Sequence, residues 1–360
     1  MSDKTREMWE LPESQGLDAL FVTSQANQRY LEGFTGADCF MLATREGNYL
    51  IADSRYTEMA ESECRSAAVV PHRAPNPPVQ HVVSRLARDN GLRRIGFERG
   101  KLIWGLYDDI AKALEDAGAE LVPVSSLVER VRAKKTADEA EMIEAACAIA
   151  DRALEDVLPV VKAGISELDL KIELDYRMRT GGAEDTAFDT MVLFGARGSQ
   201  PHANSRRDVP LKAGDFILID FGALRDGYRS DTTRTFVFGR ASDEQRRAYM
   251  TVLESQTASL EKVAPGSNGR DINDLALGII RGAGLPAFEY GIGHGVGLEI
   301  HEEPFMRQNT DVILEAGMVV TIEPGSYKPG WGGIRIEDTV LVTPDGHRVL
   351  SRFPKELTEL

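Results

Sequence analysis

The first third of the chain alternates short apolar runs with helical segments. Strands are expected where four to six largely apolar residues follow one another, at 17–22, 40–43, 49–52, 94–97 and 120–124. A helix is expected where apolar side chains recur at helical spacing, at Val79, Val82, Val83, Leu86 and Ala87, with Gly91 as its stop. Another helix is expected at about 107–117. This alternation predicts a small α/β domain over residues 1–128.

The pattern changes after a charged link at 129–135. Thr136 and Glu139 have the spacing of a capping box, in which a hydroxyl and a carboxylate satisfy free backbone N–H groups at a helix start. One apolar stripe follows, at Ile143, Ala146, Cys147, Ala150, Leu154 and Val157. A second helix is expected to open at Ser166 and to end at Gly181. Strands are expected at 216–221 and 235–238.

The same order of elements then recurs. Ser242 and Gln245 form another capping-box spacing, which opens a helix that reaches about Val263. Asp271 is expected to cap a second helix, and strands are expected at 318–322 and 334–342. Residues 129–360 therefore form a second domain, which we interpret as two copies of helix, helix and strands with a cleft between them. The fold class is α/β (α+β) with an internal pseudo-two-fold duplication.

Composition narrows the class of protein. The net charge is −15 and no Lys/Arg cluster forms a basic face, so no nucleic-acid partner is expected. Three cysteines, an odd number with no CxxC pair, favour neither a disulfide framework nor a thiolate zinc site. The first ten residues are polar, and no stretch approaches the ~18 apolar residues that cross a membrane. The sequence predicts a soluble, cytoplasmic protein without a membrane partner.

Four carboxylates lie in or beside apolar strands. Asp220 and Glu323 end the runs that begin at Phe216 and Met318, and Glu337 lies inside the alternating run from Ile334. Asp231 comes just before the strand at 235–238. Burying such groups uncompensated costs several kcal/mol, by order of magnitude, so they need cations. Ion pairs with Arg234 or Arg335 would account for one of them, but not easily for all four.

A histidine between glycines joins this set. His294 lies in the run from Gly291 to Gly297, whose alternate glycines permit close backbone approach. Taken alone, such a histidine is more often a hydrogen-bonded residue than a ligand. One imidazole and four carboxylates without thiolates suit a pair of divalent ions, above all Mn²⁺, with Co²⁺, Fe²⁺ or Zn²⁺ as alternatives. Two such ions activate water and offset the buried charge.

These runs resemble the metal motifs of the pita-bread metallopeptidases, which include aminopeptidase P, prolidase and methionine aminopeptidase. The motifs are Asp220–Thr235, Gly293–Pro304, Thr321–Gly325 and Gly333–Asp338, in family order. The segment 132–136 resembles the entry to their catalytic domain. The first 128 residues are similar to the creatinase-like N-terminal domain of aminopeptidase P and prolidase, which methionine aminopeptidases generally lack.

The resemblance implies a role for each matching residue. Asp220 would bind one metal ion, His294 and Glu323 would bind the other, and Asp231 and Glu337 would bridge both. Glu323 would also take the proton of the attacking water. The remaining roles are those of His202 and His301, which would stabilise the substrate oxyanion, and of Arg335 and Tyr327, which would support the ligands. Family members also often form homodimers, which we adopt as an expectation.

One position departs from the family pattern. Many proline-specific members have a histidine four residues before the metal-binding histidine, where this chain has Tyr290. The resemblance implies that this side chain faces the substrate pocket, so the fit to proline depends on it.

The favoured activity is a dinuclear-metal exopeptidase that hydrolyses the N-terminal Xaa-Pro bond of a peptide, as aminopeptidase P does. The alternative is an Xaa-Pro dipeptidase, or prolidase, which needs a group, often arginine, for the free carboxylate of its dipeptide substrate. The sequence does not place such an arginine. A creatinase-like hydrolase without metals is disfavoured by the five ligands. A catalytically inactive peptide-binding module is disfavoured because it would not require the ligands and the flanking histidines.

Overall fold

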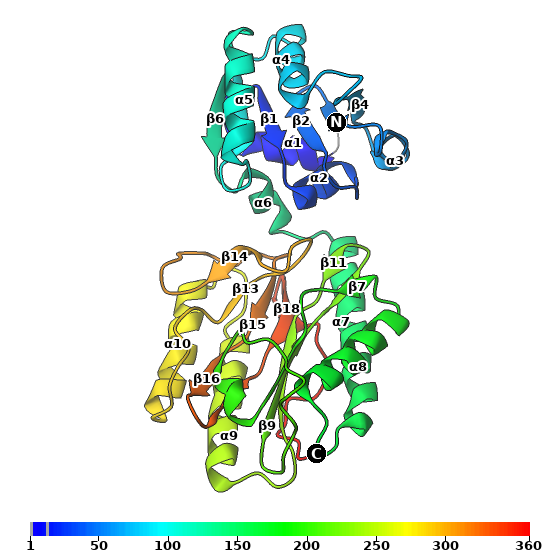
Figure 1. The fold of residues 1–360 in the computed structure, drawn as a ribbon. Coiled ribbons are helices and arrows are strands. Elements are labelled where there is room, and N and C mark those ends of the chain that lie inside the picture. Colours follow the sequence, from blue (N-terminus) through cyan, green and yellow to red (C-terminus); the bar gives the residue numbers. More distant parts are fainter. Residues whose placement is uncertain (1–2, 12–13) are drawn as a thin grey trace. The chain divides into compact units, whose positions relative to one another are not determined.

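A computed structural model describes residues 3–11 and 14–360 of the chain. The chain forms two compact units, Met1–Arg132 and Ala133–Leu360 (Figure 1). The sequence prediction places the domain boundary between residues 128 and 129, inside what the structure shows to be a short helix, α6 (Leu127–Arg132). Among the described residues, no helix is long and apolar enough to cross a bilayer.

The first unit is built on a six-stranded mixed sheet with the order β4-β3-β2-β1-β5-β6. The strands are β1 (Ala19–Val22), β2 (Phe40–Thr44), β3 (Asn48–Ala52), β4 (Ala68–Pro71), β5 (Arg94–Glu98) and β6 (Glu120–Val124). The helices are α1 (Asp3–Glu10), α2 (Gln25–Glu32), α3 (Thr57–Glu63), α4 (Val79–Asp89) and α5 (Trp104–Glu115). The apolar stripe of α4 packs with Ile110 and Leu114 of α5 against Phe21 and Ile95 of the sheet. The predicted α/β class is therefore confirmed.

The second unit begins with the expected capping box. The Glu139 N–H donates to the Thr136 hydroxyl at 3.3 Å, and the Thr136 N–H donates to the Glu139 carboxylate at 2.9 Å. The helix that follows, α7 (Ala137–Val157), buries its predicted stripe against α8 (Glu167–Thr180), which Ser166 caps. A 3₁₀ turn, η2 (Leu158–Val160), lies between the two helices.

A second pair of helices follows, α9 (Asp243–Leu260) and α10 (Gly269–Gly282). The predicted cap of α10 at Asp271 is wrong. The helix already begins at Gly269, and its cap is Asn268, whose side chain accepts the Arg270 N–H at 2.9 Å. Asp271 instead lies in the first turn, where its charge faces the positive end of the helix dipole. Figure 1 shows α7 and α8 on one side of the strands of this unit, and α9 and α10 on the other.

The strands of the second unit form two three-stranded sheets, one five-stranded sheet and one two-stranded sheet. One three-stranded sheet has the order β12 (Thr232–Val237), β9 (Phe216–Phe221), β8 (Met191–Phe194), and the other has the order β11 (Tyr228–Arg229), β10 (Ala223–Arg225), β7 (Asp185–Thr186). The five-stranded sheet has the order β14 (Glu302–Met306), β13 (Gly293–Gly295), β15 (Val319–Ile322), β18 (Asp338–Thr343), β19 (Gly346–Val349). The two-stranded sheet pairs β16 (Gly325–Lys328) with β17 (Gly332–Arg335). A second 3₁₀ turn, η3 (Gly195–Ser199), follows β8.

The single strand predicted at 334–342 is wrong in one respect that matters for the site. The chain changes its partner there, because β17 pairs with β16 and β18 pairs with β15. Glu337 lies in the break between β17 and β18 and donates its N–H to the Thr233 carbonyl of β12 at 3.1 Å. The break therefore brings Glu337 to the place where the strands of the two halves meet.

Candidate metal centre

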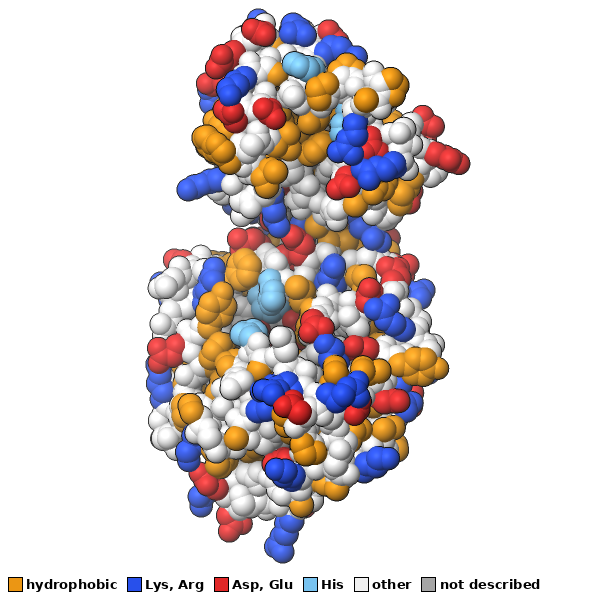
Figure 2. All heavy atoms as spheres, in the orientation of Figure 1, with side chains coloured by type: hydrophobic (Ala, Val, Ile, Leu, Met, Phe, Trp, Pro, Cys, Tyr) orange, Lys and Arg blue, Asp and Glu red, His pale blue; other side chains and the backbone are white. Residues whose placement is uncertain are grey.

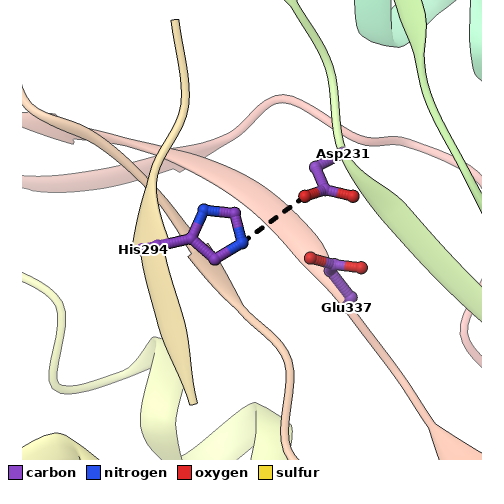
Figure 3. Close-up of side chains that lie close together, drawn as sticks. All are labelled: Asp231, His294 and Glu337. Carbon is purple, nitrogen blue, oxygen red and sulfur yellow. Dashed lines mark ion pairs between the residues drawn. The ribbon is translucent and has the colours of Figure 1, made fainter. Parts of the chain in front are cut away.

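Three of the predicted ligands converge in the second unit. Asp231 comes just before β12, His294 lies in β13, and Glu337 comes just before β18. Each side chain offers one ligand atom, and the three atoms all lie within 4.8 Å of one another (Figure 3). All three residues are buried, so the ligands come from different strands into one interior position.

The backbone around His294 aims its ring at the carboxylates. Nδ1 lies 3.0 Å from the Gly295 carbonyl, which leaves Nε2 at 3.5 Å from Asp231 Oδ2 and 3.3 Å from Glu323 Oε1. A Cβ on Gly293 would lie 2.0 Å from the Thr321 carbonyl oxygen, and one on Gly295 would lie 2.2 Å from the Glu303 carbonyl oxygen. Glycine is therefore required on both sides of this histidine.

The other two predicted ligands are held by neighbouring side chains. Glu323, just after β15, accepts the Thr321 hydroxyl at 3.2 Å. Asp220, in β9, forms an ion pair with Arg335, whose guanidinium also donates to the Tyr327 hydroxyl at 2.6 Å. Arg335 thus contacts Asp220 directly, and Tyr327 contacts Arg335.

Arg335 compensates only part of the buried negative charge. Asp220 Oδ1 and Glu337 Oε1 are buried and have no hydrogen-bond partner within the described part of the chain. Burial and the charge of neighbouring carboxylates raise the pKa of Asp231 and of Glu337 well above the usual range. Open carboxylate oxygens in an interior with too little positive charge fit a pair of divalent cations.

Glu323 and His294 each favour the charged form of the other. Burial acts against ionisation of Glu323, but the hydrogen bond and the charge of His294 hold the pKa of Glu323 below its usual range. Burial likewise acts to lower the pKa of His294, and the hydrogen bond and charge of Glu323 outweigh it, so the pKa of His294 is raised. A cation bound between them would replace the proton they share.

The three residues predicted to contact the substrate, His202, Tyr290 and His301, are exposed. The His301 ring lies 4.3 Å from the His294 ring, centre to centre, in an edge-on contact. His202 is exposed in the loop after η3, and Figure 2 shows histidine side chains at the surface of the second unit. Tyr290 is 71% exposed, and its ring lies 6.2 Å from that of Phe288, which in turn packs edge-on against Tyr327.

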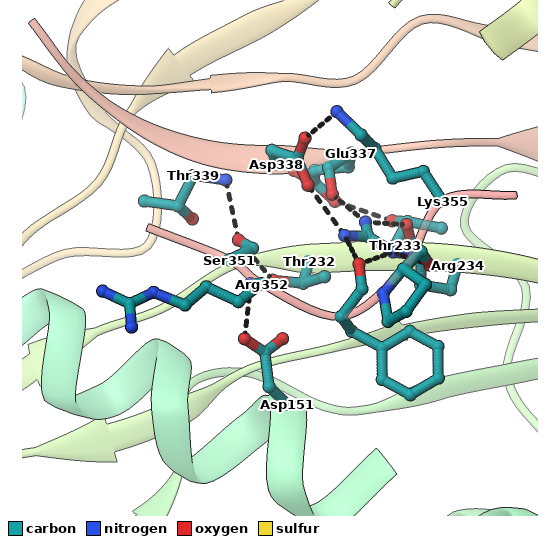
Figure 4. A network of polar contacts seen from close by, with 12 residues as sticks. Asp151, Thr232, Thr233, Arg234, Glu337, Asp338, Thr339, Ser351, Arg352 and Lys355 are labelled. Atoms are coloured by element: carbon teal, nitrogen blue, oxygen red, sulfur yellow. Dashed lines mark hydrogen bonds and ion pairs between the residues drawn. The ribbon is translucent and has the colours of Figure 1, made fainter. Parts of the chain in front are cut away.

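A buried polar network joins the strands that carry Asp231 and Glu337 (Figure 4). The Thr339 hydroxyl donates to the Asp231 carbonyl at 2.7 Å, and the Arg234 guanidinium donates to the Glu337 carbonyl. Arg234 also pairs with Asp338 at 2.8 Å, and Lys355 donates to the same carboxylate at 2.7 Å. The sequence predicts Arg234 only as a possible ion-pair partner of a candidate ligand, whereas in the structure it binds the Glu337 carbonyl and Asp338. In the sequence, the signal for this network is the group of three threonines around Arg234, at positions 232, 233 and 235.

Residues 141–344 match the metallopeptidase family M24, and residues 9–134 match the creatinase/prolidase N-terminal domain. The first of these matches covers more than half of the 360 residues. The chain belongs to metallopeptidase family M24. The resemblance that the metal motifs indicated is thereby confirmed, and this M24 peptidase is a metal-dependent hydrolase.

The M24 peptidase is similar to dipeptidases and to an aminopeptidase over nearly its whole length. It is 33% identical to a Xaa-Pro dipeptidase of Pyrococcus horikoshii, covering 99% of each chain. A solved Xaa-Pro dipeptidase from Bacillus anthracis has a TM-score of 0.94 at 35% identity and 99% coverage of each chain. A solved X-Pro aminopeptidase from Thermotoga maritima has a TM-score of 0.89 at 31% identity, covering 99% of this chain and all of that one.

Removing metal from this M24 peptidase should lower its melting temperature. Metal at 100 times its dissociation constant stabilises the folded state by about 2.7 kcal/mol, and each kcal/mol shifts the melting temperature of a domain of this size by about 2–4 °C. We therefore expect chelation to lower the melting temperature by about 5–10 °C, and Mn²⁺ to restore it. Thermal unfolding followed by fluorescence measures this. The same temperature before and after verified metal removal would contradict a metal site between these carboxylates.

Proposed function

We propose that the chain is a dinuclear-metal Xaa-Pro dipeptidase, that is, a prolidase. The observation that carries this proposal is the buried convergence of Asp231, His294 and Glu337, with Glu323 and Asp220 beside them. The names of the dipeptidases from Pyrococcus horikoshii and Bacillus anthracis favour this activity over the aminopeptidase P activity that the sequence favoured. Assembly as a homodimer and a cytoplasmic location stay predictions.

The five ligands would share two ions, for which we propose Mn²⁺. Asp220 would hold one ion, His294 and Glu323 the other, and Asp231 and Glu337 would lie between both. When bound, two such ions lower the pKa of a water molecule and polarise the scissile carbonyl. The Thr233 hydroxyl, which donates to Glu337 Oε2 at 2.6 Å, leaves Oε1 of that carboxylate open toward the centre.

The chain's own groups would move the proton and bind the developing charge. Glu323 would accept the proton of the attacking water and pass it to the proline nitrogen as the peptide bond breaks. His301 and His202 would donate hydrogen bonds to the carbonyl oxygen as it becomes negative. Proline has no N–H when its nitrogen is part of a peptide bond, so recognition at that position rests on shape. We assign this recognition to the aromatic rings of Tyr290 and Phe288, of which Phe288 packs against Tyr327.

A dipeptidase also needs a cation for the free carboxylate of its substrate, and we assign this role to Arg307. Phe305 lies opposite His294 in the β13–β14 pair, so the two side chains share a face of the sheet. Arg307 follows by two residues, and its guanidinium lies 4.9 Å from the centre of the Phe305 ring. Among the described residues, no carboxylate forms an ion pair with it. Arg307 is therefore a cation two residues beyond the strand partner of His294, and it is available to a ligand.

Arg307→Gln should reduce the cleavage of a dipeptide selectively. A charge-assisted hydrogen bond contributes about 1.5–3 kcal/mol, so kcat/KM for an Xaa-Pro dipeptide should fall about 10–100-fold. Cleavage of the corresponding Xaa-Pro amide, which has no carboxylate, should change little. The assay compares both substrates for the wild type and for Arg281→Gln, the control arginine, which pairs with Glu289 at the surface. Equal losses on dipeptide and amide, or no loss, would remove Arg307 from this role.

A further inference from the structure

We propose that Lys135 is a positioning residue for His301, acting through its buried ion pair with Glu302. The proposal rests on the proposed function, in which His301 contacts the substrate carbonyl. It concerns a pair of residues outside the metal ligands, 167 positions apart in the chain. Nothing in the ligand motifs requires a lysine at this place.

The ion pair is almost wholly buried. Lys135 Nζ lies 2.8 Å from Glu302 Oε1, and the two side chains are 1% and 2% exposed. The second carboxylate oxygen, Oε2, accepts the Glu299 N–H at 3.1 Å. The carboxylate is thus bound on one side to the segment before α7, and on the other to the start of the turn that carries His301.

The turn from residue 297 to residue 302 is folded around this carboxylate. A Cβ on Gly297 would lie 2.4 Å from Glu302 Oε1, so the carboxylate packs directly against the glycine. The Gly297 N–H donates to the Glu299 carbonyl at 3.1 Å, which closes the turn. The Glu302 carboxylate therefore contacts both Gly297 and Glu299 and holds the turn together.

His301 depends on this turn for its position. Its ring contacts the His294 ring, and within residues 3–11 and 14–360 its side chain makes no hydrogen bond of its own. The residue next to it is Glu302, whose side chain and backbone are both fixed, since β14 begins there. The position of the His301 backbone, and with it the reach of the ring, therefore depends on the turn that Glu302 and Arg229 hold.

Lys135 is itself anchored to the strand that leads to Glu323. Its N–H donates to the Gly317 carbonyl at 2.8 Å, and Lys134 forms a bridge with Met318 just before β15. Gly317 has φ +91°, and a Cβ there would lie 3.1 Å from the Lys135 carbonyl oxygen. Through these contacts the ion pair connects the His301 turn to the strand that ends at the proposed proton acceptor.

Stability alone does not explain why these two positions are charged. Well-packed apolar residues in place of a buried ion pair are often as stable or more stable, because desolvation of the two charges is avoided. An apolar pair would lack the directed N–H···O contacts that orient the carboxylate and, through it, the turn. The charge therefore serves orientation, which predicts an effect on catalysis without a matching effect on folding.

The test uses K135M/E302L, in which both charges are replaced together, and E302Q, which keeps the shape of Glu302. With saturating Mn²⁺ and an Xaa-Pro dipeptide, kcat should fall about 10–100-fold, since misplacement of a contacting group has effects of this order. KM and the amount of bound Mn²⁺ should stay within about threefold of the wild type, because uniform binding is left intact. The control is K134M/E315Q, which removes an ion pair about half exposed at the adjacent position and should change none of these quantities.

Combination with His301→Ala separates positioning from general damage. If Lys135 and Glu302 act through His301, adding K135M/E302L to H301A should lower kcat no further than H301A alone. Full additivity of the two losses, or unchanged kcat in both E302Q and K135M/E302L, would overturn the proposal. Wild-type cleavage in the same assay decides the proposed function separately.

A measurement without turnover keeps the proposal testable if the wild type cleaves no Xaa-Pro bond. In the metal-free protein with ¹⁵N-labelled histidine, the ring signals of His301, assigned by their absence in H301A, should shift or broaden in E302Q. The ring of His347, whose Nδ1 lies 3.0 Å from the Val263 carbonyl, serves as the internal control and should not change. Unchanged His301 signals would overturn the proposal whatever the activity.

Discussion

Glu337→Gln should abolish measurable peptidase activity and reduce the metal content of the protein. Glu337 Oε1 is buried and open toward the centre, while Oε2 accepts the Thr233 hydroxyl. The amide keeps the volume of the side chain and an acceptor for Thr233, so it removes the charge with little change in packing. Because losing a partner of a ligand alone lowers metal affinity or activity 10–100-fold, losing this ligand should lower kcat/KM by at least about 1,000-fold.

Metal analysis distinguishes this result from a loss of folding. After gel filtration with Mn²⁺, the wild type should retain about two ions per chain and E337Q fewer. Asp345→Asn, which changes an exposed carboxylate in a turn, should retain the wild-type amount and full activity. E337Q with the wild-type metal content and wild-type kcat would show that this residue is not a ligand.

His301→Ala should lower kcat by about 100–1,000-fold, as the removal of one oxyanion donor does in other hydrolases. Partial burial and the positive charge of His294 hold the pKa of His301 below its usual value. The ring is therefore neutral near pH 7 and keeps one N–H that can be donated to the carbonyl oxygen. Since His301 is not a proposed ligand, the bound Mn²⁺ and the melting temperature should stay close to those of the wild type.

Steady-state kinetics with an Xaa-Pro dipeptide, together with metal analysis, provide the check. His81→Gln is the matched control, because His81 is exposed in the first unit. A fall in kcat with KM almost unchanged would agree with a contact made mainly in the transition state. H301A with wild-type kcat would contradict the role of this histidine, and H301A without bound metal would make it a ligand instead.

The proposed ligands could be selected from the sequence because most of them break a local rule. Asp220, Glu323 and Glu337 are acids in apolar runs, and His294 lies among glycines that regular structure does not favour. The helices of the second unit were equally accessible, since capping boxes and apolar stripes are local signals. The cap of α10 was wrong because Asn268 and Asp271 both suit a helix start, and the choice depends on where the helix packs.

Contacts between distant segments could not be predicted in the same way. The Lys135–Glu302 pair and the Arg234–Asp338 pair join residues more than 100 positions apart. The place of Arg307 depends on the register of β14 against β13, which has an irregularity next to His294. The sequence therefore indicated the metal chemistry but did not indicate which group would bind the substrate carboxylate. Without such a group, the sequence favoured aminopeptidase P over a dipeptidase.

The most direct test of the proposed activity compares two substrates of one enzyme. Metal-free protein is reloaded with Mn²⁺ and given an Xaa-Pro dipeptide, or the same dipeptide extended by one residue beyond proline, with Glu323→Ala as the inactive control. We predict that the dipeptide is cleaved with a kcat/KM at least about tenfold higher, because only its carboxylate can reach Arg307. Cleavage mainly of the longer peptide would contradict the dipeptidase assignment and indicate an aminopeptidase P, and cleavage of neither would contradict an Xaa-Pro peptidase altogether.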